Sequence, residues 1–285
     1  MYCRGRTRRM FGGADVVADC AADVRDALDR VASEREQVLA KRRAVERFER
    51  RVRKLAAQSA RPPAGTTRAT ACGTASVAAA TRRDDAADEG RRRVRELFAE
   101  TIRPHSVSDV SESEPLAVTI REEFGPEVAT ALSPDAGSRF TPAAKEAVVS
   151  AATERQRGLD GMCRALDGEE RSLRAALAVL DECEDWVARA DETPLSELGF
   201  DALRRRHETL AGHREACDRL VRERQRHLNG ATHHTAAVEV DHRFLATYLY
   251  EDRATDYPVL AAATRVDDSC ADCQRAVRDH LVRRV

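Results

Sequence analysis

The chain has 285 residues, of which 42% are hydrophobic, 34% are charged and only 4% are aromatic. Its 48 Lys and Arg residues are balanced by 49 Asp and Glu residues, which argues against a globally basic nucleic-acid-binding protein and against an acidic solvating tail. No segment approaches the roughly 18 apolar residues of a membrane-spanning helix, so we expect a cytoplasmic protein that does not enter a membrane.

The first part of the chain combines a basic arm with a long helix. Residues 1–13 contain four arginines followed by two glycines, which predicts a disordered basic arm. Residues 14–60 predict one long helix with a heptad repeat, because valine occupies six successive a positions. These valines are Val17, Val24, Val31, Val38, Val45 and Val52. The matching d positions hold Cys20, Ala27, Glu34, Lys41, Phe48 and Leu55.

Charge is distributed unevenly along this helix. Aspartates dominate its first half, whereas the stretch from Lys41 to Lys54 holds eight basic residues against Glu46 and Glu49. Acidic residues near the start of a helix and basic residues near its end complement the helix dipole. We therefore interpret the basic cluster as a solvated, dipole-stabilising face, with nucleic-acid contact as the alternative.

A linker and several short helices are predicted next. Residues 61–90 are rich in Ala, Thr and Gly, lack apolar periodicity and open on two prolines, which predicts a flexible linker. Residues 91–140 predict short helices, one of which is interrupted by Gly125 and Pro126. This pair of short helices lacks a basic recognition face, so a capping elbow is favoured over a DNA-binding helix-turn-helix.

Residues 141–285 predict a long antiparallel helical hairpin and two C-terminal helices. The pairs Thr141-Pro142 and Thr193-Pro194 both combine an N-cap residue with a proline at the first helical position. The first long helix repeats the heptad with Ala152, Leu159, Leu166, Leu173, Leu180 and Val187, offset by three from Val148, Arg155, Met162, Glu169, Ala176 and Cys183. The second continues it with Leu203, Leu210 and Cys217 and ends at Asn229-Gly230.

The two C-terminal helices each show one apolar stripe. From Ala236 to Tyr250 the predicted stripe consists of Phe244, Leu245, Tyr248 and Leu249. The last helix, from Pro258 to about Val282, carries Val259, Ala263, Val266, Cys270, Cys273, Val277 and Leu281 on one side. The predicted fold is therefore all-α, an elongated bundle of long antiparallel heptad-bearing helices with short helices at its ends.

No catalytic arrangement is recognisable, and we expect no enzyme, cofactor or resident metal. The best metal candidate combines Cys270 and Cys273 with His213 and Cys217, a donor set that would suit tetrahedral zinc. The three cysteines fall on apolar stripes, however, so reduced thiols in core packing are favoured. The remaining candidates, His227, His233, His234 and His242, are interpreted as solvated residues of a turn.

Four charged residues at d positions bear on how the helices pair. No single parallel or antiparallel register pairs Glu34 and Lys41 with both Arg155 and Glu169. Such residues either select register and partner or extend to solvent from a narrow interface, and the second reading is favoured.

The valine seam can be buried in two ways. It can pack antiparallel onto the later long helices of the same chain, which a linker of some thirty residues permits. It can instead form a homodimer, although a parallel pair would oppose Glu34 to Glu34 and Lys41 to Lys41. We favour burial within the chain and keep the homodimer as the alternative.

Three local strings point to a family. These are EEFGPEVA at residues 122–129 followed by Ala131-Leu132, the Thr141-Pro142 helix start, and Tyr248-Leu249-Tyr250 followed by YPVLA at residues 257–261. Together with the valine-rich helix they resemble an uncharacterised haloarchaeal family of long-helix proteins, a domain of unknown function. This resemblance implies long helices over most of the chain and implies no activity.

The function expected from these features is that of a non-enzymatic helical interaction or scaffold protein. Its partner would be another protein or a second copy, bound through the helical seams. The alternative is a nucleic-acid-associated regulator that uses the basic arm, the cluster from Lys41 to Lys54 and the arginines from Arg91 to Arg95. Phosphate contacts weaken steeply with salt, so duplex binding that survives molar KCl would favour the alternative.

Overall fold

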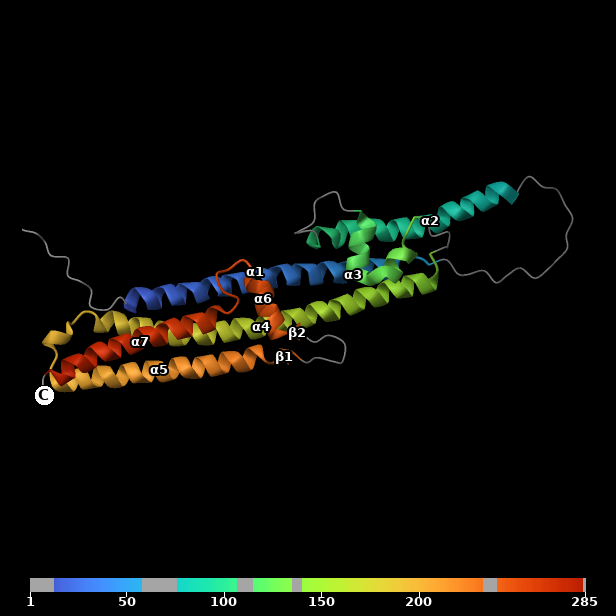
Figure 1. Ribbon diagram of the computed structural model, residues 1–285. Helices are drawn as coiled ribbons and strands as arrows, with labels where there is room; N and C mark the ends of the chain where they lie inside the picture. The colour runs from blue at the N-terminus through green and yellow to red at the C-terminus, as the bar shows by residue number, and fades with distance from the viewer. Residues whose placement is uncertain (1–12, 58–75, 107–114, 135–139, 233–239, 284–285) are drawn as a thin grey trace, which may run out of the picture. The chain divides into compact units, whose positions relative to one another are not determined.

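A computed structural model describes residues 13–57, 76–106, 115–134, 140–232 and 240–283 of the chain (Figure 1). These residues confirm the prediction of an all-α fold built from long, mutually packed helices. The predicted basic arm, apart from Gly13, and residues 61–75 of the predicted linker lie outside the described residues. The α-helices are α1 (Gly13–Lys54), α2 (Ser76–Thr101), α3 (Leu116–Ala131), α4 (Pro142–Ala190), α5 (Phe200–Leu228), α6 (His242–Tyr250) and α7 (Pro258–Val282). Two 3₁₀ turns, η1 (Arg103–His105) and η2 (Leu195–Glu197), and a short antiparallel pair, β1 (Ala231–Thr232) with β2 (Val240–Asp241), complete the structure.

The chain divides into two compact units, one comprising Met1–Arg35 with Arg164–Val285 and the other Glu36–Cys163. In the first unit, the start of α1 runs antiparallel to the C-terminal part of α4. Arg25 pairs with Asp181 at 2.5 Å, and further along α1 Arg35 pairs with the earlier Asp167 at 2.6 Å. Helices α5 and α7 are also neighbours, joined by the ion pair from Arg214 to Asp267 at 2.9 Å.

The second unit contains the end of α1, α2, α3 and the start of α4. Here Arg42 of α1 pairs with Asp160 at 2.5 Å, and Glu49 accepts a hydrogen bond from Thr153 at 3.0 Å, so the two helices are again antiparallel. Three aromatic rings, those of Phe48, Phe98 and Phe124, form the centre of the core, with centroids 5.4 to 5.9 Å apart. Because each ring comes from a different helix, this aromatic cluster fixes α1, α2 and α3 to one another.

The valine seam of α1 is buried by residues of the same chain. All six a-position valines are buried, as are Cys20, Ala27 and Phe48 at d positions. Seven-residue spacing thus identified the correct face of α1, and burial within the chain, the favoured alternative, is confirmed.

Two local predictions at helix boundaries are confirmed. Thr141 Oγ1 accepts a hydrogen bond from the Ala144 backbone N–H at 3.1 Å, which is the expected N-cap of α4. Gly125 adopts a φ of +85° and kinks α3 where Gly125 and Pro126 were expected to break it. Only glycine adopts this left-handed backbone without steric cost.

The predicted linker and the predicted second helix start need correction. Helix α2 begins at Ser76, so residues 76–90 are helical and not part of a flexible linker. This segment is rich in alanine, which has the highest helix propensity, so it is helical although it lacks an apolar stripe. Pro194 is followed by the single 3₁₀ turn η2, whose Leu195 is buried, and α5 begins only at Phe200 after Gly199.

The predicted apolar stripe of α6 is also wrong in part. This helix begins at His242, directly after β2. The Asp241 carboxylate caps it by accepting hydrogen bonds from the backbone N–H groups of Arg243 at 2.7 Å and Phe244 at 2.9 Å. Its buried residues are His242, Leu245, Ala246, Leu249 and Tyr250. Phe244 and Tyr248 lie instead on the exposed side.

Candidate functional site

Two of the charged d-position residues share one partner in the second unit. Lys41 and Arg155 both pair with Glu123 of α3, the latter at 2.8 Å. Burial would raise the pKa of Glu123, but the Arg155 charge and the Lys41 hydrogen bond outweigh burial and hold the pKa below its usual value. A carboxylate of α3 thus links the charged d positions of α1 and α4. Matching the heptads of α1 and α4 alone could not reveal this partner, because it belongs to a third helix.

The other two charged d-position residues lie in the first unit. Glu34 accepts a hydrogen bond from the Tyr248 hydroxyl at 3.2 Å. Glu169 forms an ion pair with Arg224 of α5, whose Nη2 lies 2.7 Å from Glu169 Oε1 and whose Nη1 lies 2.8 Å from Oε2. Both side chains of the second pair are completely buried.

A polar cluster surrounds Glu169. The Tyr250 hydroxyl donates to Oε1 at 2.7 Å, and His227 Nε2 lies 3.0 Å from Oε2. Ser172 Oγ accepts a further hydrogen bond from Arg224 Nη1 at 2.9 Å. Three helices, α4, α5 and α6, therefore meet at one carboxylate.

The electrostatics of this cluster favour an ionised carboxylate. Burial alone would raise the pKa of Glu169, but hydrogen bonds from His227, Arg224 and Tyr250 together with the Arg224 charge lower the pKa to about 2. Burial and the adjacent Glu169 charge raise the pKa of Tyr250, which therefore stays a hydrogen-bond donor at neutral pH. Glu169 is committed to these partners and holds the three helices together.

A cavity of about 470 Å³ adjoins the Glu169 cluster. It is lined by Arg164, Asp167, Gly168, Arg171, His227 and His242. The rings of His227 and His242 stack with their centroids 4.4 Å apart. His242 is buried and His227 is half-buried, so the interpretation of these two residues as solvated turn residues was wrong.

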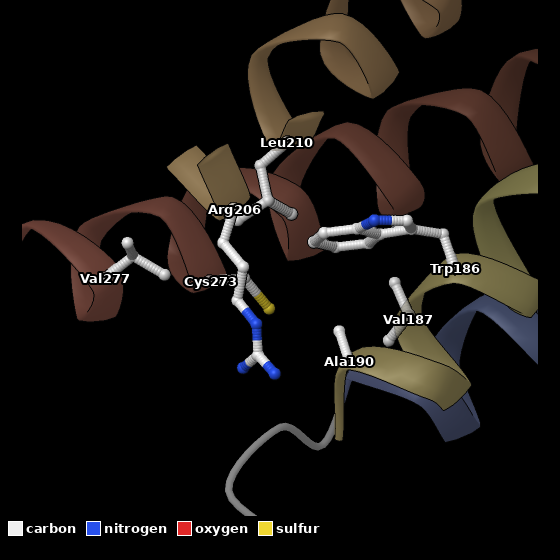
Figure 2. A pocket seen from close by; sticks show the side chains of 7 residues that line it. All are labelled: Trp186, Val187, Ala190, Arg206, Leu210, Cys273 and Val277. Atoms are coloured by element: carbon white, nitrogen blue, oxygen red, sulfur yellow. The ribbon is translucent and has the colours of Figure 1, made fainter. Parts of the chain in front are cut away.

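A second cavity, between α4, α5 and α7, is much smaller. Figure 2 shows Trp186 extending toward Leu210 and Cys273. The cavity has a volume of about 10 Å³ and holds at most one water molecule. Arg206 borders this cavity and donates a hydrogen bond to the Thr193 carbonyl at 3.1 Å. We regard it as a packing defect, because it has no room for a ligand.

The residues of the metal candidate serve other contacts. Cys270 Sγ lies 3.8 Å from Cys183 Sγ, and the His213 ring lies against Trp186 with centroids 5.3 Å apart. Burial and the neighbouring Cys270 raise the pKa of both Cys217 and Cys273 to about 12, so these thiols are protonated at neutral pH. Within the described ranges, no group of three or more His, Cys, Asp and Glu side chains is arranged to hold a metal. His233 and His234 lie outside those ranges.

Comparison with known proteins places the chain in a family. A family described as "Domain of unknown function (DUF7260)" matches residues 22–274, a range that contains Glu123, Glu169 and the larger cavity. The chain belongs to this family. No curated protein and no solved structure matches this DUF7260 chain. No described helix is long and apolar enough to cross a membrane.

Sequence reasoning missed Arg224, although a signal for it exists. Arg224 lies seven residues after Cys217 and four residues from both Leu220 and Leu228, so the apolar periodicity of α5 places it on the buried face of this DUF7260 helix. An arginine at such a position needs a buried acid, and Glu169 at a d position supplies one. His227, one turn further along α5, follows from the same helical spacing.

Proposed function

We propose that the chain is a non-enzymatic helical interaction or scaffold protein whose partner packs against the outer face of α6. The observation that carries the proposal is the exposure of Phe244 and Tyr248, whose exposed fractions are 75% and 41%. These residues are four apart and therefore lie on successive turns of the same helix face. Aromatic side chains displayed in this way are typical anchors for a partner helix.

The use of the heptad seams within the chain supports this choice of surface. The valines of α1 are already buried, so an interaction protein of this sequence needs another apolar surface. The α6 face supplies one without breaking the core, because its opposite face carries the buried Leu245 and Leu249. A helix whose one face is buried and whose other face carries aromatic residues is suited to join the chain to a partner.

The nucleic-acid alternative is less well supported. Five of the eight basic residues in the Lys41 to Lys54 cluster have carboxylate partners, which leaves little charge for phosphate groups. These five residues are Lys41, Arg42, Arg50, Arg51 and Arg53. The arginines of the N-terminal arm lie outside the described residues.

The proposal includes a cytoplasmic setting in a haloarchaeon. Only three of the 48 basic residues are lysine, and the chain is biased toward Arg, Asp, Ala and Val, as expected from a genome rich in G and C. In a cytosol of molar KCl, exposed charges are screened within a few ångströms, whereas the burial of apolar surface does not depend on charge and is not screened. An aromatic contact is therefore well suited to such a cell.

Site-specific photo-crosslinking tests the proposal. A photoreactive phenylalanine analogue placed at Phe244 of the full chain is expected to capture a protein, whereas the same analogue at Phe200, which is also exposed, is the matched control. Mass spectrometry of the crosslinked product distinguishes a second copy of this chain from another protein. Capture at position 244 no stronger than at position 200 would contradict the proposed surface.

A further inference from the structure

One face of α4 forms the floor of the larger cavity. Arg164, Asp167, Gly168 and Arg171 line it, and their spacing of three, four and seven residues places them on one side of the helix. Some charged side chains on this face form ion pairs with oppositely charged side chains and others do not. The charge that is left without a partner determines which ligand the cavity can bind.

Two histidines from other helices also line the cavity. His227 comes from the last turn of α5 and His242 is the first residue of α6, and both line the cavity. Gly168 lies beneath them: a Cβ atom added there would be 3.5 Å from His242 Cε1 and 3.6 Å from His227 Cε1. The missing side chain of Gly168 therefore leaves space beside two imidazole rings.

The cavity has an excess of positive charge. The Asp167 carboxylate pairs with Arg35 at 2.6 Å, and the neighbouring Glu169 is paired with Arg224. Arg171 donates through Nε only to the Asp167 backbone carbonyl at 3.2 Å, and Arg164 Nε is buried without a hydrogen-bond partner among the described residues. Two guanidinium groups thus face the cavity without a carboxylate partner from the described part of the chain.

We propose that this cavity binds a small molecule that carries a phosphate group. A phosphate monoester has close to two negative charges at neutral pH, which match the two guanidinium groups of Arg164 and Arg171. His227 Nε2 already bonds to Glu169, so His227 offers its other ring nitrogen and His242 its imidazole, and Gly168 leaves room for a phosphate oxygen beside them. The cavity volume of about 470 Å³ falls in the range of ligand sites and accommodates an organic group as well as the phosphate. This site does not depend on the α6 face, so either proposal can fail alone.

Calorimetric titration of the full chain at constant ionic strength tests the site. The probes are inorganic phosphate, ribose 5-phosphate and ribose. We expect both phosphates to bind and ribose not to bind. Ribose 5-phosphate binds more tightly than inorganic phosphate if its sugar also contacts the cavity. The two affinities are equal if the phosphate group alone is recognised. Failure of both phosphates to bind at up to about 10 mM would overturn the proposal.

Two arginine variants and one control locate the binding. Arg164→Gln and Arg171→Gln are each expected to weaken phosphate binding about tenfold, because each removes a charged hydrogen bond. Arg174→Gln lies on the same helix, is paired with Glu170 and should change the affinity by less than about twofold. Equal losses in all three variants would show binding by general surface charge and would overturn the assignment.

A glycine variant separates binding from folding. Gly168→Ala should raise thermal stability, since alanine favours the helix and its Cβ would make only ordinary contacts. The same Cβ would occupy the space beside the imidazoles, so phosphate affinity should fall about threefold or more. Gly212→Ala on α5, where an added Cβ meets nothing within 4 Å, should raise stability and leave affinity unchanged. If Gly168→Ala binds phosphate as tightly as the parent chain, the ligand does not occupy this cavity.

Discussion

Arg224 of α5 and Glu169 of α4 form a bidentate ion pair, and their side chains are 0% and 1% exposed. Transfer of both charges from water is costly, and their attraction compensates only while the geometry and the surrounding hydrogen bonds are complete. Tyr250 and His227 bond to the carboxylate and Ser172 accepts from Arg224 Nη1, while Arg224 Nε is buried without a hydrogen-bond partner among the described residues. The pair therefore makes the first unit sensitive to the loss of either partner.

Truncation of one partner should be strongly destabilising. Arg224→Met leaves the Glu169 carboxylate buried without its counter-charge, and we expect it to reduce the free energy of unfolding by about 3 to 5 kcal/mol. Chemical denaturation followed by circular dichroism measures this change. The double variant Glu169→Met with Arg224→Met should recover part of the loss, since two apolar side chains replace two charges.

The exposed Arg222 provides the control for that experiment. It lies two residues before Arg224 on α5, and Arg222→Met should change the free energy of unfolding by less than about 0.5 kcal/mol. An Arg224→Met variant as stable as Arg222→Met would mean that the buried pair contributes nothing to the fold.

The lowered pKa of Glu169 predicts acid sensitivity. Its pKa is about 2 in the folded chain against an ordinary value of 4.5, so the stabilisation is complete above pH 4.5 and is lost as the pH falls toward 2. Between pH 5 and pH 3 this carboxylate should account for a loss of about 2 kcal/mol. Glu169→Gln removes the titrating group, and its unfolding free energy should fall less over this interval. Parallel curves for the two proteins would exclude Glu169 as the group responsible.

Regular spacing made much of the fold predictable. The valines of α1, the start of α4 at Thr141-Pro142 and the break at Gly125 each follow from local rules of periodicity, capping or backbone freedom. These rules act within one helix. They indicate which face is buried but not which partner covers it.

The candidate site depends on contacts between distant segments, which explains why it was missed. Glu123 joins Lys41 to Arg155, and the larger cavity unites α4 with His227 and His242 from either side of a connection that includes β1 and β2. In α6 the aromatic residues suggested a buried stripe, but the Asp241 cap and the burial of Tyr250 set a different face inward. Hydrophobicity alone could not distinguish the two faces.

The aromatic cluster of the second unit predicts a second large effect. Phe48 is completely buried and contacts both Phe98 and Phe124, so Phe48→Ala should cost about 3 to 5 kcal/mol of unfolding free energy through lost burial and a new cavity. Phe244→Ala removes the same atoms from an exposed position and should cost less than about 0.5 kcal/mol. Denaturant titrations of both variants check the prediction, and equal losses would contradict the assignment of Phe48 to the core.

Two glycines of the second unit should respond to alanine in opposite directions. An added Cβ meets nothing within 4 Å at either Gly125 or Gly158, so collisions with neighbouring side chains cannot explain a difference between them. Gly125 has a φ of +85°, which strains any residue with a Cβ, and Gly125→Ala should lower the free energy of unfolding by about 1 to 2 kcal/mol. Gly158 lies inside α4, where alanine restricts the unfolded chain and favours the helix, so Gly158→Ala should raise it by about 0.5 to 1 kcal/mol. Thermal and chemical denaturation of both variants measure the two signs. Stabilisation by Gly125→Ala would mean that α3 is straight at this residue in solution and that the kink between its two halves is absent.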